Sequence, residues 1–184
     1  MLRLRPVLVT LLLVPAVLAS SGAALAAGWP GGDAPVPLEA RRVDTSKPDR
    51  YIGKGTPRSC TSRAVVRAVA KGGVIRFRCG KKPVTIKMQA TAKVRNDRPP
   101  VVLDGRGRVT LDGMGKRRIL YMNTCDREQV WTTSHCQDQD HPTLTVQGLT
   151  FRNGHAWGKG TMDGGGAIFV RGGRLKVIDS RFFG

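Results

Sequence analysis

The sequence predicts an all-β fold of the solenoid type, in which short strands stack in parallel. Residues 142–154 and 173–184 repeat one pattern at an offset of 31. The aligned apolar pairs are Leu144 and Leu175, Val146 and Val177, and Phe151 and Phe182. Such a repeat cannot bury its apolar face alone, so several repeats must stack. No helical pattern interrupts the later strands, which argues against alternating strands and helices. A β-sandwich of short strands is the alternative.

The start of the sequence has the organisation of a secretory signal peptide. Arg3 and Arg5 precede an apolar run over residues 6–19, and Ala24-Leu-Ala26 provides a cleavage site. The run is short for a membrane span. We therefore expect cleavage after Ala26, a secreted, extracellular protein, and no transmembrane segment once the signal peptide (residues 1–26) is removed.

Residues 27–57 are predicted to be a flexible leader, because proline, glycine and charged residues dominate this stretch. The folded domain is expected over residues 58–184. It ends on an apolar repeat, where stacked repeats need a polar cap or further repeats, so the sequence predicts the N-terminal piece of a longer protein or a truncated reading frame. The open end would also offer an edge for self-association.

A short amphipathic helix is expected at the start of this domain. Thr61 or Ser62 can cap its N-terminus, valines recur on one side, and Gly72-Gly73 ends it. The helix would cover the exposed first repeat, although a surface position is the alternative.

Nine short strands are predicted after the helix, since β-branched residues alternate between Gly, Asp and Asn turns. They span residues 74–78, 84–88, 101–103, 109–111, 119–122, 144–146, 149–151, 167–170 and 175–178. Asp104-Gly105 and Asp112-Gly113 are predicted to be corners of the stacked repeats, which makes Asp104 and Asp112 turn formers. Antiparallel hairpins are the rival interpretation of both sites.

The cysteines number four, an even count in a chain with an export signal, and this predicts disulfides. They are Cys60, Cys79, Cys125 and Cys136. Closure of short loops favours Cys60 with Cys79 and Cys125 with Cys136 among three pairings. A zinc site is the alternative, but no C-x-x-C is present and His135 and His141 do not complete one. We therefore predict no metal site and no cofactor.

Positive charge is concentrated in the first half of the domain. The formal charge of the chain is +18, and residues 50–118 hold 19 Lys or Arg against three Asp, whereas residues 119–184 hold seven basic and six acidic residues. Such a surface attracts nucleic acid, uronic-acid polysaccharide or wall polymer. For an exported protein we expect an acidic polysaccharide or cell-wall polymer and no nucleic acid. A generally basic composition is the alternative.

Residues 123–141 are predicted to form a loop, too polar for a strand and too long for a corner. The loop carries Trp131, the two later cysteines and four acids, which are Asp126, Glu128, Asp138 and Asp140. Loops on a rigid scaffold often hold binding chemistry. The competing interpretation, which we favour, is that the disulfide only fastens an insertion.

Five segments together resemble one known group of proteins. They are residues 59–61, 68–80, 111–113, 144–154 and 164–168. They resemble secreted bacterial right-handed parallel β-helix proteins of the pectin-lyase-like superfamily, and Gly-Gly-Ala-Ile and Phe-x-x-Asn look like repeats of polymorphic outer-membrane proteins. The resemblance implies a right-handed parallel β-helix with a short N-terminal capping helix. The lyases of that superfamily hold Ca²⁺ with acidic side chains and use Arg or Lys as base, and its hydrolases use paired Asp.

No residue set in the sequence matches those catalytic groups, so the catalytic residues stay unknown. The first hypothesis is a secreted protein that binds carbohydrate or a cell-surface polymer. The second is a polysaccharide lyase or glycosidase acting on acidic polysaccharide, with the loop acids and Arg117 or Arg118 as candidates and Ca²⁺ required if it is a lyase. The third is a structural or adhesive protein without a reaction.

Overall fold

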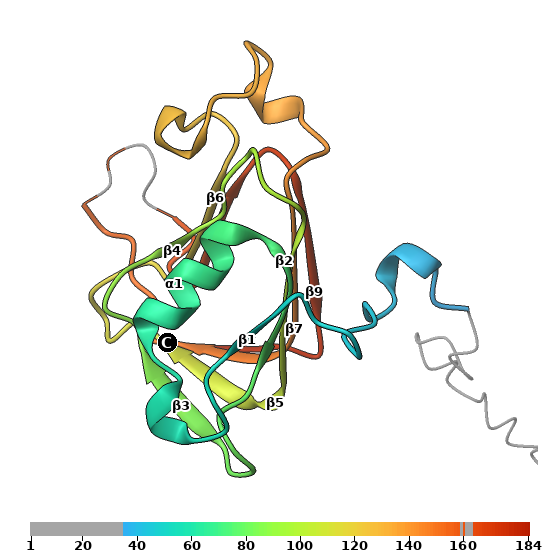
Figure 1. Cartoon of the computed structure of the whole chain (residues 1–184). Coiled ribbons are helices and arrows are strands. Elements are labelled where there is room, and N and C mark those ends of the chain that lie inside the picture. Colours follow the sequence, from blue (N-terminus) through green and yellow to red (C-terminus); the bar gives the residue numbers. More distant parts are fainter. Residues whose placement is uncertain (1–34, 159, 161–163) are drawn as a thin grey trace, which may run out of the picture. The chain divides into compact units, whose positions relative to one another are not determined.

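Two parallel β-sheets and one α-helix make up the fold in this computed structural model, which describes residues 35–158, 160 and 164–184 (Figure 1). The predicted signal peptide lies outside the described residues. The strands are β1 (Arg50–Ile52), β2 (Gly73–Phe77), β3 (Val84–Lys87), β4 (Ala92–Lys93), β5 (Val101–Asp112), β6 (Leu120–Asn123), β7 (Thr143–Arg152), β8 (Ile168–Arg171), β9 (Arg174–Ile178) and β10 (Arg181–Phe183). The helices are α1 (Ser62–Lys71) and the short 3-10 helices η1 (Leu38–Ala40), η2 (Pro57–Ser59), η3 (Arg127–Gln129) and η4 (Cys136–Asp138).

The larger sheet has seven strands, in the order β1-β2-β5-β7-β10, with β3 also paired to β5 and β9 also paired to β7. Its register stacks equivalent side chains: Ile75 pairs with Leu103, Leu103 with Val146, and Val146 with Val177. The predicted offset of 31 between the two repeats is confirmed, because Leu144 pairs with Leu175 in the same register.

The smaller sheet contains β4, β6 and β8 in that order. Side chains alternate between its two faces, as the period of a strand requires. Leu120 is fully buried on the inner face, whereas Tyr121 and Phe169 stack on the outer face with ring centroids 5.3 Å apart. The inner faces of both sheets therefore share one apolar core.

Helix α1 completes this core. The Thr61 hydroxyl accepts a hydrogen bond from the Ala64 N–H at 3.2 Å, and Gly72, with φ +69°, ends the helix. Val65 and Val69 are fully buried, and α1 packs against β1, β2 and β4. Figure 1 shows α1 in front of the strands, where it covers the interior between the two sheets.

This arrangement corrects the predicted fold class. An all-β right-handed parallel β-helix is wrong, because the structure is a mixed α/β fold in which parallel sheets pack with a helix. The helix was expected as a cap outside the repeats, but its buried valines belong to the same hydrophobic cluster as Ile75 and Leu103. Burying each valine contributes about 1.5–3 kcal/mol, so α1 is part of the core.

Stacked corners bend the strands of the larger sheet. The register between β5 and β7 shifts between Asp104 and Val109. At this level Arg106 has φ +51°, Gly148 has φ +58° and Asp179 has φ +46°, so neighbouring layers bend through the same left-handed conformation. The predicted corners at Asp104 and Asp112 are confirmed, because the carboxylates accept hydrogen bonds from the N–H groups of Arg106 and Met114, at 2.9 and 2.8 Å.

An N-terminal strap, residues 41–46, crosses the outer face of the larger sheet. The Val43 N–H donates to Oε1 of Gln147 and the Gln147 amide donates to the Val43 carbonyl, both at 3.0 Å. The Thr45 hydroxyl donates to Asp104 at 2.5 Å. Ile52 of β1, further along, is fully buried. Part of the expected flexible leader is therefore integral to the fold, and that expectation is wrong for the strap and β1.

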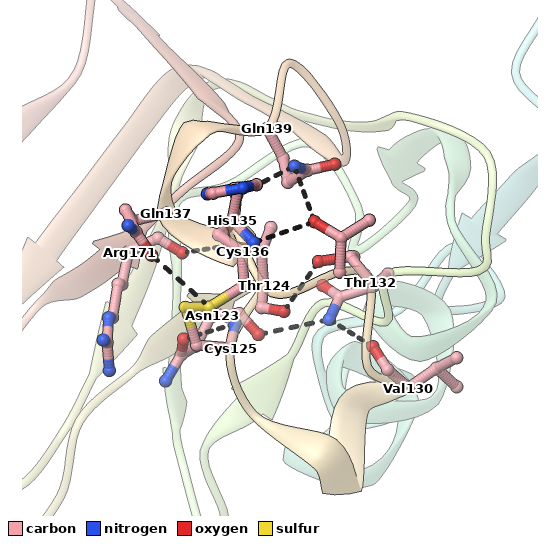
Figure 2. The surroundings of a disulfide bond; sticks show 12 residues. Asn123, Thr124, Cys125, Val130, Thr132, His135, Cys136, Gln137, Gln139 and Arg171 are labelled. Atoms are coloured by element: carbon pink, nitrogen blue, oxygen red, sulfur yellow. Dashed lines mark hydrogen bonds between the residues drawn. A yellow bond between two sulfur atoms is a disulfide. The ribbon is translucent and has the colours of Figure 1, made fainter.

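The predicted loop between β6 and β7 is held by its own contacts (Figure 2). The disulfide Cys125–Cys136 joins Cα atoms 5.0 Å apart, which confirms the predicted pairing. The Thr124 hydroxyl contacts the carbonyl oxygens of Cys136 and Arg171, and the Thr132 hydroxyl donates to the Thr124 carbonyl at 3.2 Å. The loop is therefore a folded insertion that its disulfide and these hydrogen bonds hold together.

The second predicted disulfide, Cys60–Cys79, is also present, with Cα atoms 5.6 Å apart. It joins the residue before the N-cap of α1 to the chain that follows β2. Within the described part of the chain, no helix has the length and apolar character needed to cross a membrane.

Candidate functional site

A cleft of about 390 Å³ lies where the larger sheet turns its corner. Strands β2 and β3 pair with the two halves of β5, so the loop between β2 and β3 lies beside the corner of β5. The cleft is lined by Tyr51, Gly55, Arg76, Phe77, Arg78, Cys79, Gly80, Lys82, Val84, Gly105, Arg106, Arg108 and Val109. Five of these side chains are cationic, and none is acidic.

The corner of β5 directs the side chains of Arg106 and Arg108 toward solvent. The hydrogen bond from the Arg106 N–H to Asp104 and the left-handed backbone at Arg106 and Gly107 turn the strand sharply. Arg106 and Arg108 are both exposed as a result. The Arg108 guanidinium also donates to the carbonyl of Lys81 at 3.3 Å, which links the corner to the loop before β3.

The other side of the cleft is fixed by main-chain contacts and a disulfide. The Gly55 N–H donates to the Arg78 carbonyl at 2.6 Å, and Cys79 is bonded to Cys60. Arg78 lies over the Tyr51 ring, with its guanidinium carbon 5.5 Å from the ring centroid. Tyr51 remains 50% exposed, so the cleft combines an accessible aromatic ring with cations.

The positive charge of the cleft is not balanced by direct ion pairs, although Arg76 interacts at longer range with the carboxylate of Asp44. Within the described residues, none of its five cations forms an ion pair with a carboxylate. Asp104, the nearest acid by sequence, is already engaged by Thr45 and Arg42. Arg76 donates to the Thr45 carbonyl at 3.2 Å, and its Nε atom is buried without a hydrogen-bond partner. The cleft can therefore attract and hold anionic groups.

Two other hollows differ from the cleft because each contains a carboxylate. One includes Glu39 beside Leu175, and the other includes Asp112 beside Asn153 and His155. Burial alone would raise the pKa of Asp112. Hydrogen bonds from the Met114 N–H and the Asn153 amide, with the positive charges of Arg152 and Lys87, together lower that pKa.

The structure does not bring the predicted catalytic candidates together. Asp126 accepts a hydrogen bond from the Glu128 N–H at 2.9 Å and so caps η3. Glu128 pairs with Lys93 at 3.1 Å, and Asp140 pairs with Arg174 at 2.9 Å. Asp138 is exposed at the end of η4. Asp126, Glu128 and Asp140 thus serve the loop and its attachment, whereas Asp138 faces solvent.

Arg117 and Arg118 also have structural partners. Arg117 donates to the Gln89 carbonyl, and Arg118 donates to the carbonyl oxygens of Gly164 and Gly165 at 2.7 and 3.2 Å. The Arg118 guanidinium lies 4.5 Å from the centroid of Phe169. In the part of the chain that is described, no group of three His, Cys, Asp or Glu side chains could hold a metal ion.

The individual cations of the cleft were not predicted as site residues. The net positive charge of residues 50–118 indicated the correct half of the chain, but composition does not show which cations converge. Arg106 gave a local signal, since it follows the predicted Asp104-Gly105 corner and must point outward there. Tyr51 gave none, because it lies in the stretch assigned to the leader.

Comparisons of the chain with protein-family models, with curated proteins and with solved structures gave no match. Function must therefore be argued from the cleft and its surroundings.

Proposed function

We propose that this protein binds an acidic polysaccharide, or a comparable anionic polymer of the cell surface, through the basic cleft. The observation that carries the proposal is the convergence of five cations without a carboxylate in a cleft of about 390 Å³. Carboxylate or sulfate groups of a polymer would accept hydrogen bonds from the arginines.

The aromatic ring favours an acidic sugar over a small inorganic anion. Tyr51 presents half of its surface beside Arg78, and an exposed aromatic ring can pack against the apolar face of a sugar ring. Cation and ring together suit a uronate, which carries both a flat apolar face and a carboxylate.

An extracellular location forms part of the proposal. The chain has a predicted signal peptide, and both cysteine pairs are bonded, as is usual in an oxidising compartment. Surface polysaccharide would then be the accessible anionic polymer.

The test is binding of polygalacturonate by the chain without its signal peptide, measured by titration calorimetry, with a neutral polysaccharide as control. We expect the double variant Arg78→Gln and Arg106→Gln to lower affinity about tenfold or more, since a hydrogen bond to a charged group contributes about 1.5 kcal/mol or more. The variant Arg127→Gln with Arg181→Gln, which removes the same charge outside the cleft, should bind normally.

Three outcomes would contradict the proposal. They are equal binding of the neutral polymer, an equal loss in both double variants, and no binding at all. Release of unsaturated uronates that absorb ultraviolet light would instead indicate a lyase.

A further inference from the structure

A row of cations lies on the solvent side of helix α1. Arg63, Arg67 and Lys71 follow one another at intervals of four residues, and all three are exposed. Four residues of α-helix rise about 6 Å, so the three charges are spaced regularly along one side of the helix. The opposite side of α1 is occupied by the buried Val65, Ala68 and Val69.

Stabilisation of the helix explains only part of this row: Lys71, in the last turn, suits the negative end of the helix dipole, whereas Arg63 and Arg67 have no such role. The first turn of α1 contains no acidic residue and does contain Arg63, although the helix dipole favours negative charge there. No acidic residue occurs in the helix, so Glu–Lys pairs at a spacing of four are missing. None of the three cations has an ion pair among the described residues.

The start of α1 is linked to the wall of the basic cleft. The disulfide Cys60–Cys79 joins the start of α1 to the wall of the cleft. Gly80 of that wall lies against the turn before the helix, since a Cβ built on it would be 3.3 Å from the Gly55 carbonyl and 3.6 Å from Pro57. The turn itself carries Lys54 and Arg58, both exposed.

We propose that the cleft, the turn and the outer side of α1 form one binding track for a linear polyanion with several charged repeats. The inference rests on the proposed function and deepens it, because it assigns a ligand longer than the cleft can hold. The ligand class is an extended acidic polysaccharide whose negative groups recur at a spacing comparable to the helical step. The cleft binds one end of the bound segment, and the helix binds the next repeats.

The experiment compares galacturonate dimers with the long polymer, using the chain without its signal peptide. The track variant carries Arg63→Gln, Arg67→Gln and Lys71→Gln, because glutamine keeps a high helix propensity. The matched control carries Lys116→Gln, Arg171→Gln and Arg181→Gln, which remove the same charge from exposed positions elsewhere. Circular dichroism of each variant verifies that the fold is intact.

We expect the track variant to bind the dimer as the original chain does and to bind the polymer more weakly. The plot of log affinity against log salt concentration should become shallower by about 2, since each lost contact to a single-stranded polyanion removes about 0.7 from the slope. The control should retain the original slope for the polymer.

The outcomes separate the two proposals. If the track variant binds both ligands like the original chain, the track is wrong and the cleft stands. If the control loses as much polymer affinity as the track variant, net charge alone acts, and the track is again wrong. If the original chain binds neither ligand, the proposed function itself fails.

Discussion

Asp112 shows how a single carboxylate links a corner of the fold to pH. Its Oδ1 atom accepts hydrogen bonds from the Met114 N–H at 2.8 Å and from the Asn153 amide at 3.0 Å, and Arg152 lies 3.8 Å from its Oδ2 atom. Burial opposes ionisation, but these contacts outweigh burial and lower the pKa of Asp112 from 3.8. The carboxylate therefore stabilises the folded state only when it is ionised.

The sign of the pH dependence follows from the lowered pKa. The unfolded chain takes up this proton first as pH falls, so the stabilisation is present above the ordinary pKa of 3.8 and is lost as pH drops through the folded value. We expect Asp112→Asn to lower the free energy of unfolding at pH 7. Near pH 2 the free energies of unfolding of the variant and of the original chain should become similar.

Urea unfolding across this pH range measures the difference between the two proteins. Asp138→Asn, which removes an exposed loop carboxylate, controls for the change in net charge. A constant difference between Asp112→Asn and the original chain at every pH would contradict the prediction.

Single residues also show what sequence patterns can and cannot reveal about this protein. The Asp-Gly pairs indicated the corners correctly, because the side-chain to backbone hydrogen bond is local in sequence. Gln147 gave no such signal, since its amide bonds the main chain of Val43, which lies 104 residues earlier. The arginines of the cleft were missed for the same reason, because their convergence depends on the fold.

At the scale of the element, the stacked corners require glycine for two different reasons. At one position a side chain would clash with the neighbouring corner, and at the other only the backbone conformation favours glycine. Gly148 and Gly107 both have positive φ, +58° and +71°. A Cβ on Gly148 would lie 2.9 Å from the Gly107 nitrogen, whereas a Cβ on Gly107 would meet nothing within 4 Å. A substitution at Gly107 therefore tests the backbone strain alone, whereas a substitution at Gly148 tests the strain together with a steric clash.

We expect Gly107→Ala to cost roughly 1–2 kcal/mol, the cost of a left-handed conformation in a residue with a Cβ. Gly148→Ala should cost that amount and a further contribution of about 1–3 kcal/mol from overpacking against the neighbouring corner. Chemical denaturation of both variants gives the comparison. Equal losses of stability in the two variants would show that the neighbouring corner accommodates the methyl group at position 148 without cost.

The elements were predicted unevenly for identifiable reasons. Regular apolar alternation located most strands of the larger sheet, although β5 and β7 each proved to be one bent strand where two were predicted. The two-residue β4 and the three-residue β1 and β10 were missed because they are too short to show a period. The fold class was wrong because the role of α1 in the core depends on packing, which its own amphipathic pattern does not specify.

At the scale of the whole molecule, the two disulfides are expected to stabilise different units. Cys60 and Cys79 belong to the hydrophobic cluster that includes α1 and both sheets, whereas Cys125 and Cys136 close the loop between β6 and β7. Their separations are 19 and 11 residues, and loops of this length contribute about 3 kcal/mol each in the chain-entropy model.

Replacing Cys60 and Cys79 by alanine should therefore lower global stability by about 3 kcal/mol and increase hydrogen exchange across α1, β1 and β2. Replacing Cys125 and Cys136 should increase exchange first within the loop. Hydrogen exchange followed by mass spectrometry distinguishes these patterns. A protein-wide increase from the second replacement would show that the loop is coupled to the core.

The strap has a consequence for the order in which the molecule is assembled. Its partners Gln147 and Asp179 lie 104 and 137 residues further along the chain, in or beyond the strands that it crosses. Although residues 41–46 are synthesised before these two partners, they can make these contacts only after the later strands have formed. Until β7 and β9 have formed, the strap can contact earlier parts of the chain such as Asp104 and Arg76, but its contacts with Gln147 and Asp179 come last and complete its closure across the sheet.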